Sequence, residues 1–391
     1  MKRHILGIFV LIFALSTAPV LAGDFVLLKG GKFLEPAPKS GSNPPLREDH
    51  EDDNAIHTVI SEDYDKVVIS LKIPGGRSSR QPMDTEKVDT IFYWPKPAVY
   101  VDGVNAMIEG RYDDAISKFD SLAENRQMRF WVRAYSIFSM AQIYEEQGNV
   151  RMAVDTWEQL VKEFPKFRQV PHALVQIGLG WMTLGDGNQA RAAFGRLQRL
   201  PGLPEGKKGL ALYYLIFIKQ KQGEATKNDS LIRAALSEYE SLLGKVENDP
   251  EQAEVALRAR LGIGNCKVLL GQFDEAIAFF QKIADSSDEG AVLAGAFNGL
   301  GKCYFRQARY KDALKAFLRV EILYDVDAEQ TAMALCYSGR CFRFMQGKGI
   351  GEDNGDRARG QYRKCFGRFP GSTWAADAKT EITQVKSDRP R

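Results

Sequence analysis

Small and aromatic residues recur along the chain at the spacing of one helical turn. Ala115 is followed four residues later by Phe119, and Ala276 is followed in the same way by Phe280. Residues four apart lie on one face of an α-helix, so each pair indicates a helix that packs through this face. Seven alanines of this kind recur 37 to 45 residues apart: Ala115, Ala153, Ala190, Ala235, Ala276, Ala313 and Ala358. Seven copies in register predict a repeat protein.

A second small residue precedes several of these alanines by twelve positions. It is Gly103, Ala141, Gly178, Gly264 or Gly301 in the respective copies. Because a small residue lets a neighbouring helix approach closely, each copy is predicted to be two packed helices joined by a short turn. The pattern therefore predicts a mainly α fold, an α-solenoid of about seven helix pairs over residues 97–371.

The repeat resembles the tetratricopeptide repeat, whose unit carries a small residue in its first helix, followed by Gly, an aromatic, Ala and a second aromatic. Phe164-Pro165 and Phe369-Pro370 match the proline that closes such units. The resemblance implies a right-handed solenoid, although most spacings exceed the 34 residues typical of the family. Two copies carry polar insertions, Glu224 to Ser230 and Gly347 to Asp356, which are predicted to be surface loops.

Residues 1–22 have the pattern of a secretory signal peptide. Lys2 and Arg3 precede an apolar run from Ile5 to Leu15, and small residues lead to Ala22. As a helix the run would span about 16 Å, roughly half of the hydrocarbon core of a bilayer, so a membrane anchor is disfavoured. Asp24 stands where a lipobox has its cysteine. Cleavage near Ala22 is expected, with a periplasmic or secreted product that does not span a membrane.

Residues 23–96 are predicted to form a small β-rich domain. Short apolar runs at 25–28 and 32–34 flank Gly30-Gly31, which is typical of a hairpin. Residues 66–73 alternate apolar and polar side chains, and 55–61 and 88–94 are further β-prone runs, which makes five strands. The loop at 36–54 contains the acidic run 48–53, which lacks the turn glycine and alternating ligands of a calcium loop.

Residues 372–391 are predicted to form a capping helix and a tail. Ser372 is the predicted N-cap, and the helix is expected to run to about Lys386. Trp374, Ala378 and Ile382 form a stripe that could cover the open end of the array.

Composition excludes further classes of protein. The chain has 53 Lys and Arg against 50 Asp and Glu, a net charge of +3, which gives no general electrostatic case for nucleic acid as a partner. Five cysteines, all in the C-terminal part, do not make a disulfide scaffold. Cys266, Cys303, Cys341 and Cys365 fall at packing positions of the repeats and are predicted to be buried thiols, whereas Cys336 matches no such position.

Catalytic and metal-binding motifs are missing from the sequence. It contains no HExxH, no His/Cys pair at metal-ligand spacing, no P-loop and no GxSxG. The sequence therefore predicts a protein that is not an enzyme, with no cofactor and no metal.

The first helices of such an array line its concave face, where a peptide can bind. Residues just after the close-packing glycines, and three or four positions further on, are predicted to point into this groove. Toward the C-terminus these are Asn265, Lys302, Phe305, Arg306, Arg340, Arg343 and Phe344. Cations pair with carboxylates, so an acidic segment or a carboxylate terminus is the predicted ligand. Related repeats hold such termini with Lys and Asn, but Leu261 stands here where that pattern has a cation.

Two functions of different classes follow from these observations. The first is a non-enzymatic protein-protein interaction scaffold of the bacterial cell envelope, which binds a peptide or protein partner in the concave groove. It is implied by a resemblance to periplasmic members of the family, of the Tol-Pal coordinator type and the outer-membrane-assembly lipoprotein type. The alternative is a structural or polysaccharide-associated envelope component that uses the β-rich domain as its contact surface.

Overall fold

The structure is a computed structural model that describes residues 25–28, 32–33, 57–73, 77–93, 96–325, 327–346 and 353–385. The predicted signal peptide, Gly30-Gly31, the acidic run 48–53 and the tail after residue 385 lie outside these residues. The chain divides into two compact units, residues 1–102 and 103–391, with the division inside the first helix. Each unit is described by itself.

The first unit contains two three-stranded antiparallel sheets among its described residues. One has the order β2-β1-β6 and the other β3-β4-β5. Val67 and Ile69 of β4 are buried, as the alternating pattern predicted. The strands are β1 (Phe25–Leu28), β2 (Lys32–Phe33), β3 (His57–Glu62), β4 (Lys66–Ile73), β5 (Arg77–Asp84) and β6 (Val88–Phe92).

Strand β5 was not among the five predicted strands. Its sequence, RSSRQPMD, carries no run of β-branched or aromatic residues and includes a proline. It nevertheless pairs with β4 along its whole length, from Lys66 opposite Asp84 to Ile73 opposite Arg77. Its pairing partner, rather than its own composition, therefore makes it a strand.

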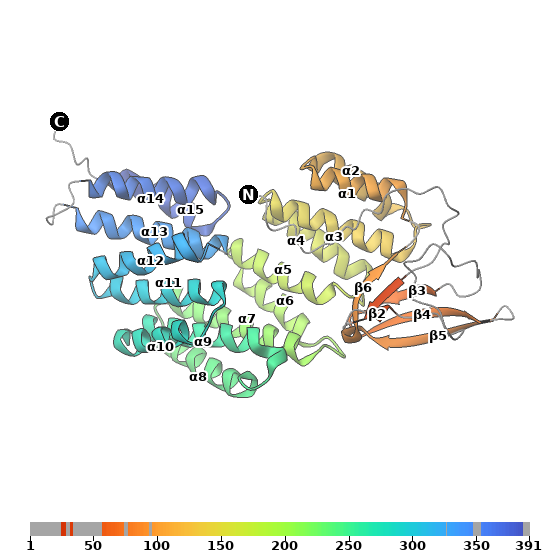
Figure 1. The fold of residues 1–391 in the computed structure, drawn as a ribbon, viewed down its shortest axis with the longest axis horizontal. Coiled ribbons are helices and arrows are strands. Elements are labelled where there is room, and N and C mark those ends of the chain that lie inside the picture. The colour runs from red at the N-terminus through yellow and green to blue at the C-terminus, as the bar shows by residue number, and fades with distance from the viewer. Residues whose placement is uncertain are drawn as a thin grey trace. The chain divides into compact units, whose positions relative to one another are not determined.

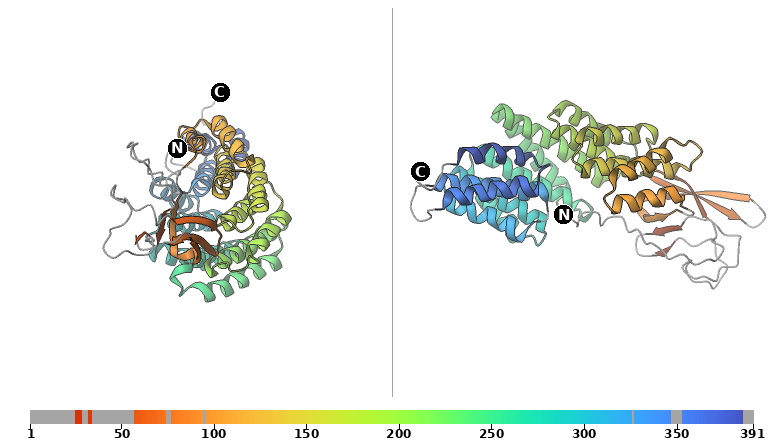
Figure 2. Two further views of the ribbon diagram at one scale, coloured as in Figure 1. Left: turned by 90° about the vertical axis from the view of Figure 1, so that its right-hand side faces the viewer. Right: turned by 90° about the horizontal axis from the view of Figure 1, so that it is seen from above.

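The second unit is an α-solenoid, which confirms the predicted fold class. The helices follow one another in sequence order as pairs along the array (Figure 1), and the array curves as it proceeds (Figure 2). Fourteen helices form the seven predicted pairs, and one more follows, counted over the described residues. They are α1 (Ala98–Ile108), α2 (Tyr112–Glu124), α3 (Phe130–Glu146), α4 (Val150–Glu163), α5 (Val170–Thr183), α6 (Gly187–Gln198), α7 (Glu205–Thr226), α8 (Asp229–Val246), α9 (Ala253–Leu269), α10 (Phe273–Asp285), α11 (Gly290–Arg306), α12 (Tyr310–Leu323), α13 (Ala328–Met345), α14 (Asn354–Arg368) and α15 (Thr373–Glu381).

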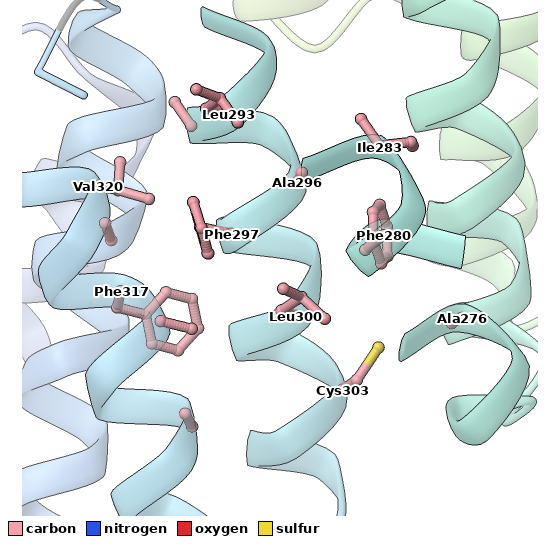
Figure 3. Close-up of a cluster of buried hydrophobic side chains, with 14 of the residues drawn as sticks. Ala276, Phe280, Ile283, Leu293, Ala296, Phe297, Leu300, Cys303, Phe317 and Val320 are labelled. Carbon is pink, nitrogen blue, oxygen red and sulfur yellow. The ribbon is translucent and has the colours of Figure 1, made fainter. Parts of the chain in front are cut away.

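Glycines meet aromatic rings within each helix pair, as the spacing predicted. A Cβ atom at Gly301 would lie 2.5 Å from the ring of Phe317, and one at Gly264 would lie 2.5 Å from the ring of Phe280. Phe280 also lies against the next pair, because a Cβ atom at Gly299 would be 2.3 Å from it. Figure 3 shows Phe280 and Phe317 in one buried cluster. The same ring therefore closes the packing within one pair and between two pairs.

The predicted loop at residues 224–230 is wrong. Helix α7 continues through it to Thr226, and only Lys227 and Asn228 separate it from α8. Lys227 ends α7 in the left-handed conformation with φ 51°, and the Asn228 side chain accepts hydrogen bonds from the backbone N–H groups of Ser230 and Leu231. The polar insertion thus lengthens a helix. In the second insertion residues 347–352 lie outside the described residues, and α14 begins at Asn354.

The predicted capping helix is confirmed but is shorter than expected. The Ser372 hydroxyl accepts a hydrogen bond from the backbone N–H of Trp374, as an N-cap does. Helix α15 ends at Glu381, and one 3-10 turn follows at Ile382–Gln384. Ala378 is fully buried, and Trp374 and Ile382 pack partly buried around the same cluster.

Candidate functional site

The predicted groove residues lie on three successive first helices of the array. Asn265 is on α9, Lys302, Phe305 and Arg306 are on α11, and Arg340, Arg343 and Phe344 are on α13. Helix α9 packs against α7 and α11, and α13 packs against α11 and α15. These first helices pack against one another in order and so form a layer, and the predicted residues are distributed along it. We call this layer, from α7 to α15, the inner layer.

Lys302 is a cation of the inner layer that lies close to other cations. Its side chain is half-buried, and it has no hydrogen bond or ion pair to any described residue. Burial lowers the pKa of its ammonium group to about 8, and repulsion from Lys221 and Arg306 adds to the effect. The charge of Glu224 acts in the opposite direction but does not outweigh them. Lys302 is therefore a desolvated cation without its own carboxylate.

The last turn of α7 faces the later repeats across the inner layer. Lys221 and Glu224 form an ion pair at 2.9 Å, and the charges of both act on Lys302. Burial raises the pKa of Tyr337 on α13, and the charge of Glu224 adds to this effect. Charges from three helices that are far apart in sequence thus converge, and one of them, Glu224, belongs to the part of α7 that was predicted to be a loop.

Phe305 and Phe344 come together in an aromatic cluster. Their ring centroids are 5.7 Å apart in an edge-to-face arrangement. Tyr310 stacks on Phe344 at 5.3 Å, and Tyr337 meets the edge of Phe305 at 5.4 Å. Phe344 remains 40% exposed. We call these four residues the aromatic patch. Arg306 follows Phe305 directly in the sequence. It is exposed and has no ion pair among the described residues.

Arg340 already binds carboxylates of its own chain. Its Nε donates to Glu381 Oε1 at 2.8 Å, and its Nη2 donates to the same oxygen at 2.5 Å and to Asp377 Oδ2 at 3.1 Å. Arg343 donates from Nη1 to the side-chain oxygen of Gln384 at 2.6 Å. Helix α15 and the turn after it therefore occupy the two predicted arginines, in what we call the cap contact.

The cap contact fixes the charge state of its carboxylate. Burial acts to raise the pKa of Glu381, but hydrogen bonds from Arg340 and Tyr362 outweigh it and hold this pKa below its usual value. The guanidinium of Arg340 also lies over the rings of Tyr337 and Trp374, with 4.6 and 5.6 Å to their centroids. The arginine and aromatic side chains at this end of the inner layer thus match a helix that carries carboxylates and an aromatic residue.

Sequence reasoning missed Tyr337, Trp374, Lys221 and Glu224 as parts of the site. Tyr337 lies three residues before Arg340, one helical turn away, so the groove spacing applied backwards could have found it. Lys221 and Glu224 carry no local signal, because their role depends on the curvature of the array.

Other chemistry is sparse in the part of the chain that the structure describes. All five cysteines are buried as free thiols, which confirms the prediction for Cys266, Cys303, Cys341 and Cys365, and Cys336 is buried although it matched no packing position. Burial raises the pKa of Cys266 to about 12, and it does the same for the other four. The described residues contain no group of three or more His, Cys, Asp or Glu side chains that could hold a metal ion. None of the described helices is long and apolar enough to cross a membrane.

Comparisons with known proteins agree with this geometry. Residues 135–166 and 258–287, which span α3 to α4 and α9 to α10, match the family model of the tetratricopeptide repeat. No curated protein matches the chain. These two segments match the tetratricopeptide repeat, and the helix pairs of the described residues have the fold of such repeats.

One solved structure shares this fold, and a second is similar at a lower score. A tetratricopeptide repeat protein from Parabacteroides merdae is 14% identical, with 73% of this chain and 97% of that chain covered at a TM-score of 0.51. The similarity to NprR in complex with its cognate peptide NprX has a TM-score of 0.44, at 12% identity over 73% of this chain and 81% of that chain. At this identity the Parabacteroides merdae structure shows a shared fold and nothing about the ligand.

Proposed function

We propose that the protein is an interaction scaffold of the bacterial cell envelope, and that its inner layer binds an acidic segment of a protein partner. Asn265, Lys302 and Arg306 would contact the carboxylates, and the aromatic patch would pack beside them. The observation that carries this proposal is Lys302, a half-buried cation with no partner among the described residues.

The physical argument concerns the free energy of the lysine charge. Placing an ammonium group in a partly dry site that also holds Lys221 and Arg306 lowers stability. An incoming carboxylate would remove this penalty and gain charge-assisted hydrogen bonds in a site where water screens little. Arg306 offers the planar donor group that pairs with carboxylates bidentately, and Phe344, 40% exposed, offers apolar contact.

The location in the envelope is proposed from the sequence. The basic start, the short apolar run and the small residues before Gly23 support export to the periplasm or the exterior, with cleavage after Ala22. Mass spectrometry of the mature chain isolated from its host tests this point. A retained N-terminal segment would contradict it.

Binding of acidic peptides to the full chain tests the function. A library of helical peptides that vary in carboxylate number is titrated by fluorescence anisotropy. The double change Lys302→Met with Arg306→Gln should weaken the best peptide at least ~100-fold, since each lost charge-assisted bond costs about 1.5–3 kcal/mol.

A matched control separates the site from net charge. Lys315→Met with Arg363→Gln removes the same two charges from exposed positions on the second helices α12 and α14. This control should bind as the unaltered chain does. Equal loss in both variants, or no acidic peptide bound at all, would contradict the proposal. Ile60 is an exposed residue of the β-rich unit. If Ile60→Asp abolishes binding instead, the β-rich unit would be favoured as the contact surface.

A further inference from the structure

We propose that helix α15 occupies part of the partner's binding site as an internal competitor. A partner helix with carboxylates one turn apart would displace it from α13. This inference rests on the proposed function, because it assumes that the inner layer binds acidic segments. It adds the form of the ligand and a means of controlling access to Arg340 and Arg343.

The cap contact shows which chemistry this end of the inner layer selects. Asp377 and Glu381 are four residues apart, so they lie on one face of α15, and both accept hydrogen bonds from Arg340. Gln384 extends the same face and accepts from Arg343. Trp374, one turn before Asp377, packs on Tyr337 at 5.6 Å. A second acidic helix with this spacing would find the same set of donors.

Helix α15 is held by the polar cap contact and by a small apolar contact. Within it only Ala375 and Ala378 are buried, and Trp374 is partly buried. The helix has nine residues, and helices of this length are marginal in water without a packing partner. Elements with few buried apolar contacts open first in native proteins, so α15 belongs to the least stable part of the array.

Release of α15 would change the inner layer in a defined way. Arg340 and Arg343 would lose their internal partners while Lys302 and Arg306 already have none. Four cations on α11 and α13 would then face a ligand instead of two. A partner that extends from α11 to α13 would therefore compete with α15 for part of its site.

The experiment uses the full chain and a labelled synthetic peptide of residues 372–385. In the unaltered chain α15 competes with this peptide for α13. In the Glu381→Gln chain the contact of α15 with α13 is weakened, so α15 competes less well. The Glu381→Gln chain should bind the peptide at least tenfold more tightly than the unaltered chain. A peptide that itself carries Glu381→Gln should bind that same chain at least tenfold more weakly. Glu124→Gln, at an exposed carboxylate at the end of α2, is the matched control and should bind as the unaltered chain does.

Hydrogen exchange distinguishes displacement from unfolding. With peptide bound, amides of residues 373–381 should exchange faster and those of α13 should not. Peptide binding that is equal in the Glu381→Gln and unaltered chains, or faster exchange in both helices, overturns the inference. A dimer of the Glu381→Gln chain without peptide binding also overturns it, because α15 would then exchange between copies. The proposed function stands or fails separately, on Lys302 and Arg306.

Discussion

Arg340 and Glu381 are 41 residues apart in sequence and share three hydrogen bonds, with Nε to Oε1 at 2.8 Å, Nε to Oε2 at 3.0 Å and Nη2 to Oε1 at 2.5 Å. The Tyr362 hydroxyl donates to Glu381 Oε2 at 2.9 Å. One carboxylate therefore joins α13, α14 and α15. The side chains of Arg340 and Glu381 are only 16% and 15% exposed, so water does little to replace either partner.

Arg340→Gln should destabilise the end of the array. The change leaves Glu381 without its strongest donor and should cost about 1.5–3 kcal/mol, as for other hydrogen bonds to charged groups. Urea denaturation followed by circular dichroism measures the free energy of unfolding. Arg363→Gln, at an exposed arginine of α14 without an ion pair among the described residues, should change it by less than about 0.5 kcal/mol. Similar losses in both variants would count against the cap contact.

The cap contact should weaken in acid. The pKa of Glu381 is lower in the folded chain than in the unfolded chain, so its contribution is present above the unfolded value of about 4.3. It is lost as the pH falls through the lower, folded pKa. Hydrogen exchange of residues 373–381 should therefore speed up below about pH 4 beyond the intrinsic trend. The Glu381→Gln chain should not show this acid step, and an identical step in both chains would contradict the assignment.

Lys302→Met should stabilise the chain while it weakens the binding of acidic peptides. At pH 7 the variant lacks the charge that burial disfavours, and a gain of about 1 kcal/mol is expected after allowance for partial exposure. The unfolded chain keeps the Lys302 proton to higher pH than the folded chain does, whose pKa is about 8. The gain should thus shrink as the pH rises from about 8 to 10.4. Thermal unfolding across this range measures it, and a loss of stability at pH 7 would be the contrary result.

Gly301→Ala should destabilise the array through the ring of Phe317. The new Cβ would lie 2.5 Å from that ring, and overpacking of this kind costs about 1–3 kcal/mol. Gly244→Ala in α8 is the control, because nothing lies within 4 Å of its Cβ position. Alanine there should stabilise the helix by about 0.5–1 kcal/mol. Opposite signs in urea denaturation are the expected result, and equal signs would contradict the packing.

The five thiols should not react in the native chain at neutral pH. Each is buried, and burial raises the pKa of Cys303 and the other four to about 12, so thiolate is scarce. Titration with a thiol-reactive dye at pH 8 should detect no reactive thiol in the native chain and five reactive thiols in urea. A fast-reacting thiol in the native chain would show that one of these sites opens.

The repeat pattern predicted most of the solenoid, because the packing positions repeat with the helices. Ala276 and Ala313 are fully buried, and Phe280 and Phe317 fill the space that their spacing indicated. These positions depend on contacts within one helix pair, so local periodicity reports them. The same periodicity places the predicted groove residues on the first helices α9, α11 and α13, and their role in binding stays a prediction.

Long-range contacts could not be predicted in this way. The pairing of Arg340 with Glu381 depends on how α15 docks on α13, and periodicity contains no information on that register. The extension of α7 resembles a polar loop in sequence, and its helical form depends on the Lys227 and Asn228 terminus. Strand β5 likewise forms because β4 offers it an edge.

The ring of Phe280, held against Gly264 in its own pair and Gly299 in the next, has a mechanical consequence. The ring of Tyr239 on α8 likewise lies against Gly262 of the next pair. Separating one of these pairs from its neighbour would remove an aromatic ring from the packing between the two pairs. Under tension the pairs from α8 to α12 should therefore resist separation at these two ring contacts.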